Sequence, residues 1–302
     1  MNKYIKAIID PYFRFNILSS RNVLFWLSDE DVLKKKYYYA FDRELNLDNP
    51  VTFNEKLQWL KLYNRNPLYT SLVDKCEVKK YVANIIGEDY IIPTIGIWNS
   101  FDEINFDELP EQFVLKCTHD SGGVIICKNK SGFNYKNAKK VISKSLKRNY
   151  YYSTREWPYK NVIPRIIAEK YMEDKTNPII DNWKFFCADG VPFIYYVTKG
   201  GGHSKNMTLT YFDMDDNKLD VKHSSYPNEK GEIALPKDLQ KMKDLAALLS
   251  RGMPFVRVDF YYVNGQIYFG ELTFFPDSGF AKFEDQLFDE YLGSFVDLSM
   301  VI

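Results

Sequence analysis

The chain has 302 residues, of which 45% are hydrophobic and 26% charged, a composition typical of a globular protein large enough for two subdomains. Its 40 basic and 40 acidic residues balance and form no basic block, which argues against nucleic acid as the main partner because binding to a phosphate backbone needs clustered positive charge. The 4 cysteines show no CxxC spacing and only 3 histidines occur, so we expect free thiols and no zinc site.

The first 27 residues contain Lys3, Lys6, Asp10, Arg14 and Arg21, so no apolar run there reaches membrane-spanning length, and no signal peptide is expected. The apolar residues between these charges could form an amphipathic helix that lies on a membrane or on a partner protein. Packing against the chain's own domain is the more common use of such a helix. We expect a cytoplasmic protein, with peripheral attachment to the inner face of the membrane as an open alternative.

Helices are expected to dominate the chain up to about residue 87. Residues 28–48 carry acidic residues near their start and lysines later, as in a helix whose ends complement its dipole. Thr52 and Glu55 have the spacing of a capping box and predict a helix through about Leu62. The apolar stripe that follows predicts a further helix ending at Gly87.

Strands are expected to dominate the rest of the chain, with helices at 135–148 and 236–251. Segments rich in β-branched and aromatic residues predict the strands: 90–94, 113–117, 124–127, part of 163–172, 183–187 and 193–198. The chain is therefore expected to have an α+β fold with mixed sheets, divided near residue 165.

A predicted β-hairpin near the C-terminus is the most informative segment. An Asn-Gly pair at 264–265, a strong hairpin signal, separates two runs of β-branched and aromatic residues. Because side chains alternate along a strand, Arg257 and Asp259 share one face of the first strand, and Glu271 and Thr273 share one face of the second.

The turn decides whether these two faces coincide. A two-residue loop at 264–265 places Asp259 and Glu271 on opposite faces, whereas a three-residue loop or one β-bulge pairs Asp259 with Glu271 and Arg257 with Thr273. In the second register the two carboxylates face each other, which is repulsive unless a cation lies between them. Such oxygen ligands suit Mg²⁺, which proteins hold with one or two carboxylates plus phosphates. A charged solvent face without a metal is the alternative.

A glycine-containing loop separates the strands expected at 113–117 and 124–127. Ser121, Gly122 and Gly123 would let backbone N–H groups wrap an anion, and Lys116 precedes the loop as a point charge for phosphate. A plain Gly-Gly hairpin turn explains the same glycines without a ligand. The residue order of a Walker A loop is missing.

The sequence also contains partial matches to the motifs of two other enzyme classes, protein kinases and DxD glycosyltransferases. Residues 258–260 (VDF) resemble the kinase DFG element, but the glycine loop follows Lys116 and no HRD motif occurs, which excludes a protein kinase. Asp213 and Asp215 could hold a metal and a sugar diphosphate, as in a DxD glycosyltransferase. Asp and Asn also cluster in this way in ordinary polar turns, which is the favoured interpretation.

The glycine loop and the hairpin, in this order along the chain, resemble motifs of the ATP-grasp superfamily, and specifically of its TupA-like branch, which is linked to surface polysaccharide synthesis. The resemblance also rests on 49–60 (NPVTFNEKLQWL), 74–75 (DK), 168–172 (AEKYM) and 181–185 (DNWKF), and it covers roughly residues 28–298. It implies two α+β subdomains that clasp ATP, at 67–165 and 166–302, preceded by an N-terminal helical extension at 1–66.

The resemblance implies roles for individual residues in binding ATP. Lys75 and Lys116 would bind phosphates, residues 121–123 would form a mobile loop over them, and residues 169–172 would form a hinge beside the adenine. The implied nucleotide contacts are Lys75, Lys116, Ser121, Gly122, Gly123, Glu169, Lys170, Tyr171, Met172 and Lys184.

The resemblance also implies a catalytic and metal site on the hairpin. Arg257, together with Lys116, would stabilise charge on the transferred phosphoryl group, and Asp259, Glu271 and Thr273 would hold Mg²⁺. Many ATP-grasp enzymes carry Asn at the position of Thr273, so a second metal would be bound more weakly. Lys205 is a further candidate contact for phosphate or substrate. The acceptors would be recognised by residues 1–66, by the glycine loop at 199–203 or by the turn at 276–279.

The implied activity is that of an ATP- and Mg²⁺-dependent carboxylate–amine ligase acting through an acyl phosphate. Its substrates would be a small-molecule or saccharide carboxylate and an amine. It would join an amino acid or amino sugar to a uronic-acid-containing precursor of a capsule or another surface polysaccharide. Two alternatives remain: a glycosyltransferase that uses Asp213 and Asp215, and a non-catalytic nucleotide-binding partner of the polysaccharide machinery.

Overall fold

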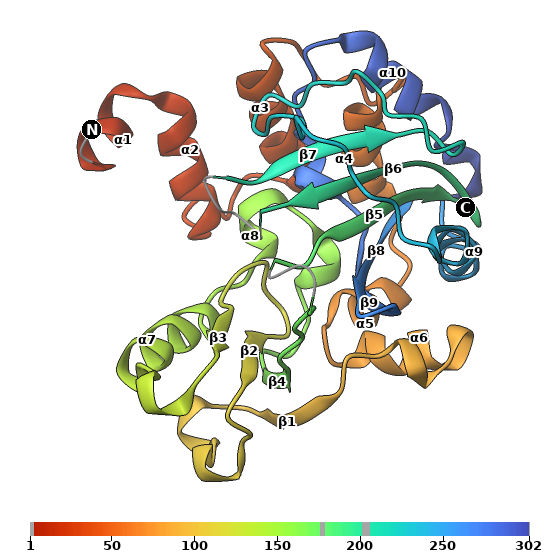
Figure 1. The fold of residues 1–302 in the computed structure, drawn as a ribbon. Helices are drawn as coiled ribbons and strands as arrows, with labels where there is room; N and C mark the ends of the chain where they lie inside the picture. Colours follow the sequence, from red (N-terminus) through yellow and green to blue (C-terminus); the bar gives the residue numbers. More distant parts are fainter. Residues whose placement is uncertain (1–2, 176–178, 201–205, 302) are drawn as a thin grey trace.

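The computed structural model describes residues 3–175, 179–200 and 206–301, and it contains two antiparallel β-sheets flanked by helices (Figure 1). The smaller sheet has the strand order β1-β4-β2-β3, with β1 (Thr94–Trp98), β2 (Phe113–Cys117), β3 (Ile125–Cys127) and β4 (Ile166–Lys170). The larger sheet has the order β7-β6-β5-β8-β9, with β5 (Asn182–Ala188), β6 (Val191–Lys199), β7 (Thr208–Phe212), β8 (Val256–Val263) and β9 (Gln266–Thr273).

The α-helices are α1 (Lys3–Ile9), α2 (Pro11–Ser20), α3 (Asp29–Phe41), α4 (Phe53–Tyr63), α5 (Leu68–Val73), α6 (Glu77–Ile86), α7 (Tyr135–Leu146), α8 (Tyr151–Thr154), α9 (Leu239–Leu249) and α10 (Gln286–Ser294). Short 3₁₀ turns are η1 (Glu88–Tyr90), η2 (Phe101–Glu103), η3 (Phe106–Glu108), η4 (Lys130–Gly132), η5 (Trp157–Tyr159), η6 (Pro276–Gly279) and η7 (Leu298–Met300). None of the helices among the described residues is both long and apolar enough to cross a bilayer.

Two of the predicted helix boundaries are corrected. The capping box of Thr52 and Glu55 starts α4 as predicted. The helix predicted over 28–48 ends at Phe41, because Asp42 takes a left-handed conformation (φ 54°). The apolar stripe before Gly87 forms two helices, because the Asp74 carboxylate accepts backbone N–H groups at the start of α6 and interrupts the run.

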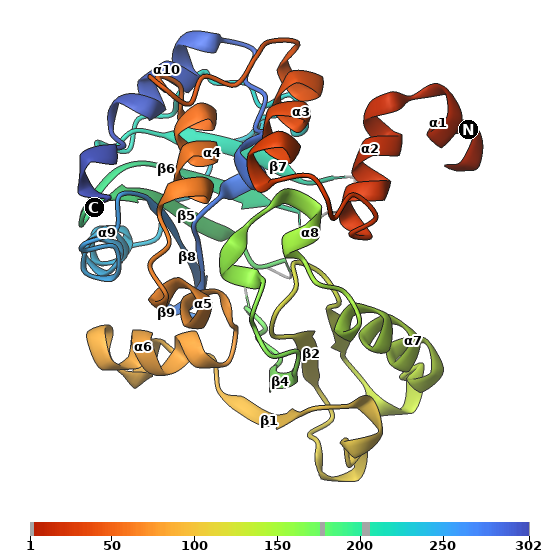
Figure 2. The ribbon, with the colours of Figure 1, turned by 180° about the vertical axis from the view of Figure 1, so that it is seen from behind.

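The larger core lies between the larger sheet and the helices around it. α4, α5, α6, α9 and α10 all contribute buried side chains to one cluster with the sheet, among them Phe53, Leu57, Leu72, Val82, Leu249 and Leu292. Figure 2 shows α4 lying against this sheet from behind. α4, the last helix of the predicted extension at 1–66, is therefore packed into the body of the molecule.

The smaller core lies between the smaller sheet and α7. Phe113 and Leu115 from β2, Ile166 from β4, and Ala138 and Ile142 from α7 are buried together. β4 pairs with β1 and β2, so this strand belongs to the smaller sheet although the predicted division at 165 precedes it. The strand expected from residue 90 begins only at Thr94, because η1 precedes it.

Candidate active site

The hairpin of β8 and β9 takes the bulged register. The turn has the two residues 264–265, both with positive φ (51° and 81°), as a tight hairpin turn requires. The pairing then shifts by one residue next to Asp259, which leaves Gly270 as the extra residue of β9. Asp259 consequently lies directly opposite Glu271, and the two carboxylates share one face of the sheet.

The Arg257 guanidinium lies among these carboxylates. Its Nε is 2.6 Å from Asp259 Oδ1, and its Nη2 donates to Asp259 Oδ2 at 2.8 Å, to Glu271 Oε1 at 2.9 Å and to Thr273 Oγ1 at 3.0 Å. Nη1 donates to the Tyr196 hydroxyl at 2.9 Å. Arg257 therefore separates the facing acids and is itself oriented by four side chains.

A second cation enters from the neighbouring strand. Lys184 on β5 pairs directly with Asp259 on β8, and its ammonium donates to Asp259 Oδ2. Burial lowers the pKa of Lys184, and the charge of Arg257 acts in the same direction. Desolvation would raise the pKa of Glu271, but Lys184, Arg257 and Lys75 outweigh it and lower this pKa to about 2. Glu271 therefore stays ionised at neutral pH.

This face fits a hard divalent cation. Burial raises the pKa of Asp259 and the charge of Glu271 adds to the effect, while Arg257 and Lys184 lower this pKa without cancelling the rise. A further cation would stabilise the ionised form of Asp259. The Glu271 side chain is 45% exposed, so it can still accept a ligand from solvent. Within the described ranges no cluster of three or more His, Cys, Asp or Glu side chains occurs, so the carboxylates of Asp259 and Glu271 would be joined as ligands by the Thr273 hydroxyl and by phosphates or water.

The two lysines predicted to bind phosphate contact the glycine loop and β4. Lys75 Nζ donates to the Asp120 carbonyl at 2.7 Å, and Lys116 Nζ lies 2.6 Å from Glu169. Lys79, which sequence reasoning missed, lies 2.5 Å from the other oxygen of Glu169. Burial would raise the pKa of Glu169, but these two lysines lower it. Lys79 lies in α6, whereas Lys75 lies in the turn before this helix, so no local pattern linked the two lysines.

The glycine loop has a fixed base and an exposed tip. β2 and β3 pair as predicted on either side of it. At the base, Ser145 Oγ donates to Asp120 Oδ2 at 2.6 Å, and the His119 ring contacts the carbonyls of Ser145 and Arg148. Gly122 and Gly123 have positive φ (145° and 59°), which L side chains rarely adopt. Ser121 and Gly122 are exposed at the tip.

A cavity of about 600 Å³ lies where the end of β4 meets the turn of the hairpin. It is lined by Asp89, Lys170, Tyr171, Met172, Glu173, Val263, Asn264, Gln266 and Tyr268. Asn264 Nδ2 donates to the Glu173 carbonyl at 2.8 Å, and Gln266 Nε2 donates to the Asp89 carbonyl at 3.1 Å. The first bond ties Glu173, which directly follows the predicted hinge segment, to the hairpin that carries the acids, and the second ties η1 to the same hairpin. The N–H of Lys170 donates to the Pro93 carbonyl.

The Asp213 segment forms a turn, as favoured from its composition. Asp213 Oδ1 accepts the backbone N–H groups of Asp215 and Asn217, and its Oδ2 accepts the Asn217 amide at 3.0 Å. The hydrogen bond from the Asn217 amide is the main reason that the pKa of Asp213 is lowered. The Lys205 side chain and residues 201–203 of the other glycine loop lie outside the described residues.

The chain has two antiparallel sheets, with lysines and a glycine loop beside the smaller one and paired carboxylates on the larger one, and a cavity lies where β4 meets the hairpin turn. This arrangement is typical of an ATP-grasp protein. A family model described as TupA-like ATPgrasp matches residues 55–297, and the chain belongs to this family. ATP-grasp enzymes are ligases that bind ATP and magnesium.

Solved structures to which the chain is similar share little sequence with it. D-Alanine-D-alanine ligase from Helicobacter pylori is 14% identical, with a TM-score of 0.43, over 81% of this chain and 68% of its own. The ATP-grasp ligase PsnB, complexed with minimal precursor, is 10% identical, with a TM-score of 0.42, over 80% and 67%. N5-Carboxyaminoimidazole synthase from Aspergillus clavatus is 12% identical, with a TM-score of 0.39, over 68% and 44%. No curated protein matches the sequence.

Proposed function

We propose that the protein is an ATP-dependent carboxylate–amine ligase that modifies a uronic-acid-containing precursor of a capsular or other surface polysaccharide. The observation that carries the proposal is the pairing of Asp259 with Glu271 on one face, with Arg257 and Lys184 between and beside them. Such a face combines a site for a divalent cation with fixed positive charge, the two things that phosphoryl transfer requires of a protein.

The nucleotide would lie along the hairpin, with its adenine in the cavity beside residues 170–172. Because the N–H of Lys170 is already bonded to Pro93, this residue would offer its carbonyl to the base. The phosphates would extend toward Lys75 and Lys116, and the exposed tip of the glycine loop would cover them. Mg²⁺ held by Asp259, Glu271 and Thr273 would neutralise phosphate charge.

The reaction would take place in two steps. A carboxylate oxygen of the acceptor attacks the γ-phosphorus of ATP, and ADP leaves. The amine then attacks the acyl carbon, inorganic phosphate leaves with that carboxylate oxygen, and the amine loses a proton. Arg257 stabilises the negative charge on the transferred group, and the glycine loop excludes water that would hydrolyse the acyl phosphate.

The test is a screen of ADP release with hexuronic acids paired with amino acids or amino sugars. We expect release that requires ATP, one uronate and one amine together, and that disappears in Glu271→Gln. ATP binding without release for any pair would instead support a non-catalytic nucleotide-binding partner. Turnover of a nucleotide sugar that survives in Glu271→Gln would support a glycosyltransferase.

We further propose that the protein works in the cytoplasm and that its N-terminal helices attach it to the inner face of the membrane. α1 and α2 project from the body near α8 (Figures 1 and 2), and Ser19 anchors them through the Tyr152 carbonyl. Ile8, Phe25 and Trp26 are 73%, 75% and 64% exposed.

The charge of this segment favours an anionic surface, since residues 1–27 carry 4 basic residues and 1 acidic residue in a chain of zero formal net charge. The test is co-sedimentation with vesicles. Binding to vesicles that contain phosphatidylglycerol, and its loss in the double variant Phe25→Ser and Trp26→Ser, would support attachment. Equal sedimentation of the variant and the wild type would contradict it.

A further inference from the structure

A pair of buried, opposite charges that ATP binding does not use lies beside η6. Glu156, the residue before η5, is 4% exposed, and Lys61 of α4 is 0% exposed. Burial lowers the pKa of Lys61 to about 7, and burial raises the pKa of Glu156, although each charge opposes the shift of the other. Apolar residues often replace such a pair without loss of stability, so charges kept beside a reaction site point to a role in the chemistry.

Both charges hold the turn η6, which follows β9 and its metal-site acid after two residues. Lys61 Nζ donates to the Ser278 carbonyl at 2.7 Å, and Gln58 Nε2 donates to the Gly279 carbonyl at 2.6 Å. The hydroxyl of Ser278 donates to Glu156 Oε1 at 2.7 Å. The backbone of the turn is therefore fixed by α4, and its hydroxyl is fixed by the buried carboxylate.

The backbone of η6 is strained at the residue that carries this hydroxyl. Asp277 and Ser278 both have positive φ (48° and 55°), which costs free energy in residues other than glycine. Gly279 continues the left-handed run with φ 65°, and a Cβ there would lie 2.3 Å from Gln58 Nε2. Strain that buried hydrogen bonds maintain is typical of a position that must present one side chain in a particular geometry.

Ser278 is linked both to the metal-site hairpin and to the glycine loop. It follows Thr273, whose hydroxyl accepts a hydrogen bond from Arg257, by only a few residues. The charge of Glu156 and burial raise the pKa of the Tyr150 phenol, and hydrogen bonding to the hydroxyls of Ser278 and Ser121 lowers it. Because Ser121 is at the exposed tip of the glycine loop, Tyr150 connects this tip with the turn.

Glu156 is also within electrostatic reach of the metal-site face. Burial is the main cause of the raised pKa of Glu156, and the charge of Glu271 adds to it. Burial, Glu156 and Glu271 raise the pKa of the Tyr159 phenol, whereas Arg257 lowers it. In Figures 1 and 2, α8, which ends just before Glu156, lies between the larger and the smaller sheet. The titratable groups that act on Glu156 come from α4, β9 and the α8–η5 segment: Lys61, Glu271, Tyr150 and Tyr159.

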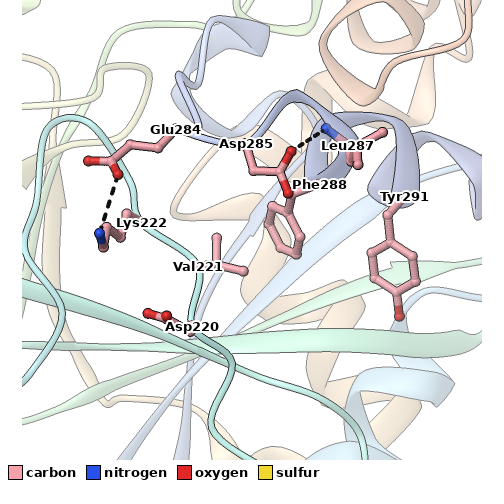
Figure 3. Close-up of a pocket in the computed structure, with 8 residues that line it drawn as sticks. All are labelled: Asp220, Val221, Lys222, Glu284, Asp285, Leu287, Phe288 and Tyr291. Carbon is pink, nitrogen blue, oxygen red and sulfur yellow. Dashed lines mark hydrogen bonds and ion pairs between the residues drawn. The ribbon is translucent and has the colours of Figure 1, made fainter.

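A cavity of about 450 Å³ beside α10 has no such links (Figure 3). Among its described lining residues are three acids and one lysine, and Lys222 lies 3.5 Å from Glu284. None of these lining residues belongs to β8, β9, η6 or the glycine loop. A molecule held in that cavity would not be placed at the reacting groups by its lining, whereas a molecule in contact with Ser278 would be close to them.

We propose that Ser278 and Glu156 take up the proton that the amine loses when it attacks the acyl phosphate. This inference rests on the proposed ligase function. The Ser278 hydroxyl donates its own hydrogen to Glu156, and even with Tyr150 as a partner one lone pair of Oγ is left for an N–H group. Ser278 touches the substrate, and Glu156 acts through it as a positioning residue.

The proton transfer accompanies the second step of the reaction. As the C–N bond forms, the amine proton passes to Ser278 Oγ, and the proton of Ser278 passes to Glu156 Oε1. The bond between the acyl carbon and the phosphate oxygen breaks, and inorganic phosphate leaves with that electron pair. Glu156 then returns its proton through Ser278 to solvent. The charge of Lys61 keeps the carboxylate ionised for the next turnover.

The test separates the two half-reactions in Glu156→Gln and in Ser278→Gly, since glycine suits the left-handed backbone but lacks the hydroxyl. ATP and each hexuronic acid are supplied with an amine or with hydroxylamine, whose weakly basic nitrogen traps an acyl phosphate without help from a base. We expect both variants to form the hydroxamate at the wild-type rate. Amide formation should fall about 100-fold, the usual contribution of a group that accepts a proton in the transition state.

Thr154→Val is the matched control. It removes the other hydrogen bond to Glu156 Oε1, which measures 2.8 Å, and leaves the Ser278 path intact. Its amide rate should stay within about threefold of the wild type, because a single hydrogen bond to a retained carboxylate changes little.

The possible results distinguish this proposal from the ligase function. Wild-type amide rates in Glu156→Gln and Ser278→Gly would overturn the proton path and leave the ligase standing. Equal losses of hydroxamate and amide would show that the two residues only support the turn, which also overturns the path. Absence of both products from the wild type with every uronate would overturn the ligase, and the proton path with it. If one variant does not fold, the other still decides the question.

Discussion

Gly270→Ala tests the bulge that brings the two carboxylates together. A Cβ at this position would lie 3.1 Å from the Asp259 carbonyl oxygen, 3.3 Å from the Asp259 Cβ and 3.2 Å from Cε2 of Tyr261. Ordinary contacts between carbon atoms are about 3.5–4.0 Å, so the neighbours must move by a few tenths of an ångström. Two of the three atoms belong to the backbone or Cβ of Asp259, so the metal-site acid itself is displaced.

We expect Gly270→Ala to lower the free energy of unfolding by about 1–3 kcal/mol, the usual cost of overpacking, and to weaken Mg²⁺-dependent nucleotide binding about tenfold. The assay is a titration with a fluorescent ATP analogue, with and without Mg²⁺, beside thermal unfolding. Gly132→Ala in η4 is the control, because a Cβ there meets nothing within 4 Å. Wild-type Mg²⁺-nucleotide affinity in Gly270→Ala would refute the role given to the bulge.

Four further substitutions test other parts of the site. Glu271→Gln should remove the Mg²⁺ dependence of analogue binding, and a retained dependence would exclude this residue as a ligand. Lys79→Met should weaken ATP binding by less than tenfold in calorimetry, because a second lysine still pairs with the shared carboxylate; complete loss would contradict this. Lys61→Met removes a buried ammonium that donates to the carbonyls of Thr154 and Ser278 and whose charge acts on buried Glu156, so it should cost about 3–5 kcal/mol in urea unfolding. A loss below about 1 kcal/mol would count against this structural role. Gly123→Ala places a Cβ 2.4 Å from Ser145 Oγ and should speed proteolysis of the glycine loop, whereas wild-type cleavage rates would show that the base tolerates it.

The chemistry of the hairpin could be predicted from the sequence, but its register could not. Strand alternation placed Arg257 with Asp259 and Glu271 with Thr273, as the structure confirms. The two-residue turn alone would have put the acids on opposite faces, and only the bulge reverses this. An isolated glycine inside a strand pattern signals a bulge, so Gly270 was the residue that carried the missing information.

The partners of the charged residues depend on tertiary contacts that no local pattern encodes. Glu169 was expected only as part of a hinge segment, yet it lies between two lysines from different elements. The segment from Thr52 to about Leu62 was predicted as a helix with a capping box. Its polar residues Gln58 and Lys61 bond to η6, which is more than 200 residues away in sequence, and that separation hid their role.

The fate of the acceptor's carboxylate oxygen reports whether an acyl phosphate forms. A uronate whose carboxylate is labelled with ¹⁸O is incubated with an amine, ATP and Mg²⁺, and the released phosphate is analysed by mass spectrometry. The carboxylate oxygen attacks the γ-phosphorus and is released as part of the inorganic phosphate. We therefore expect one ¹⁸O atom in each phosphate formed together with ADP. Unlabelled phosphate formed together with the amide would contradict it.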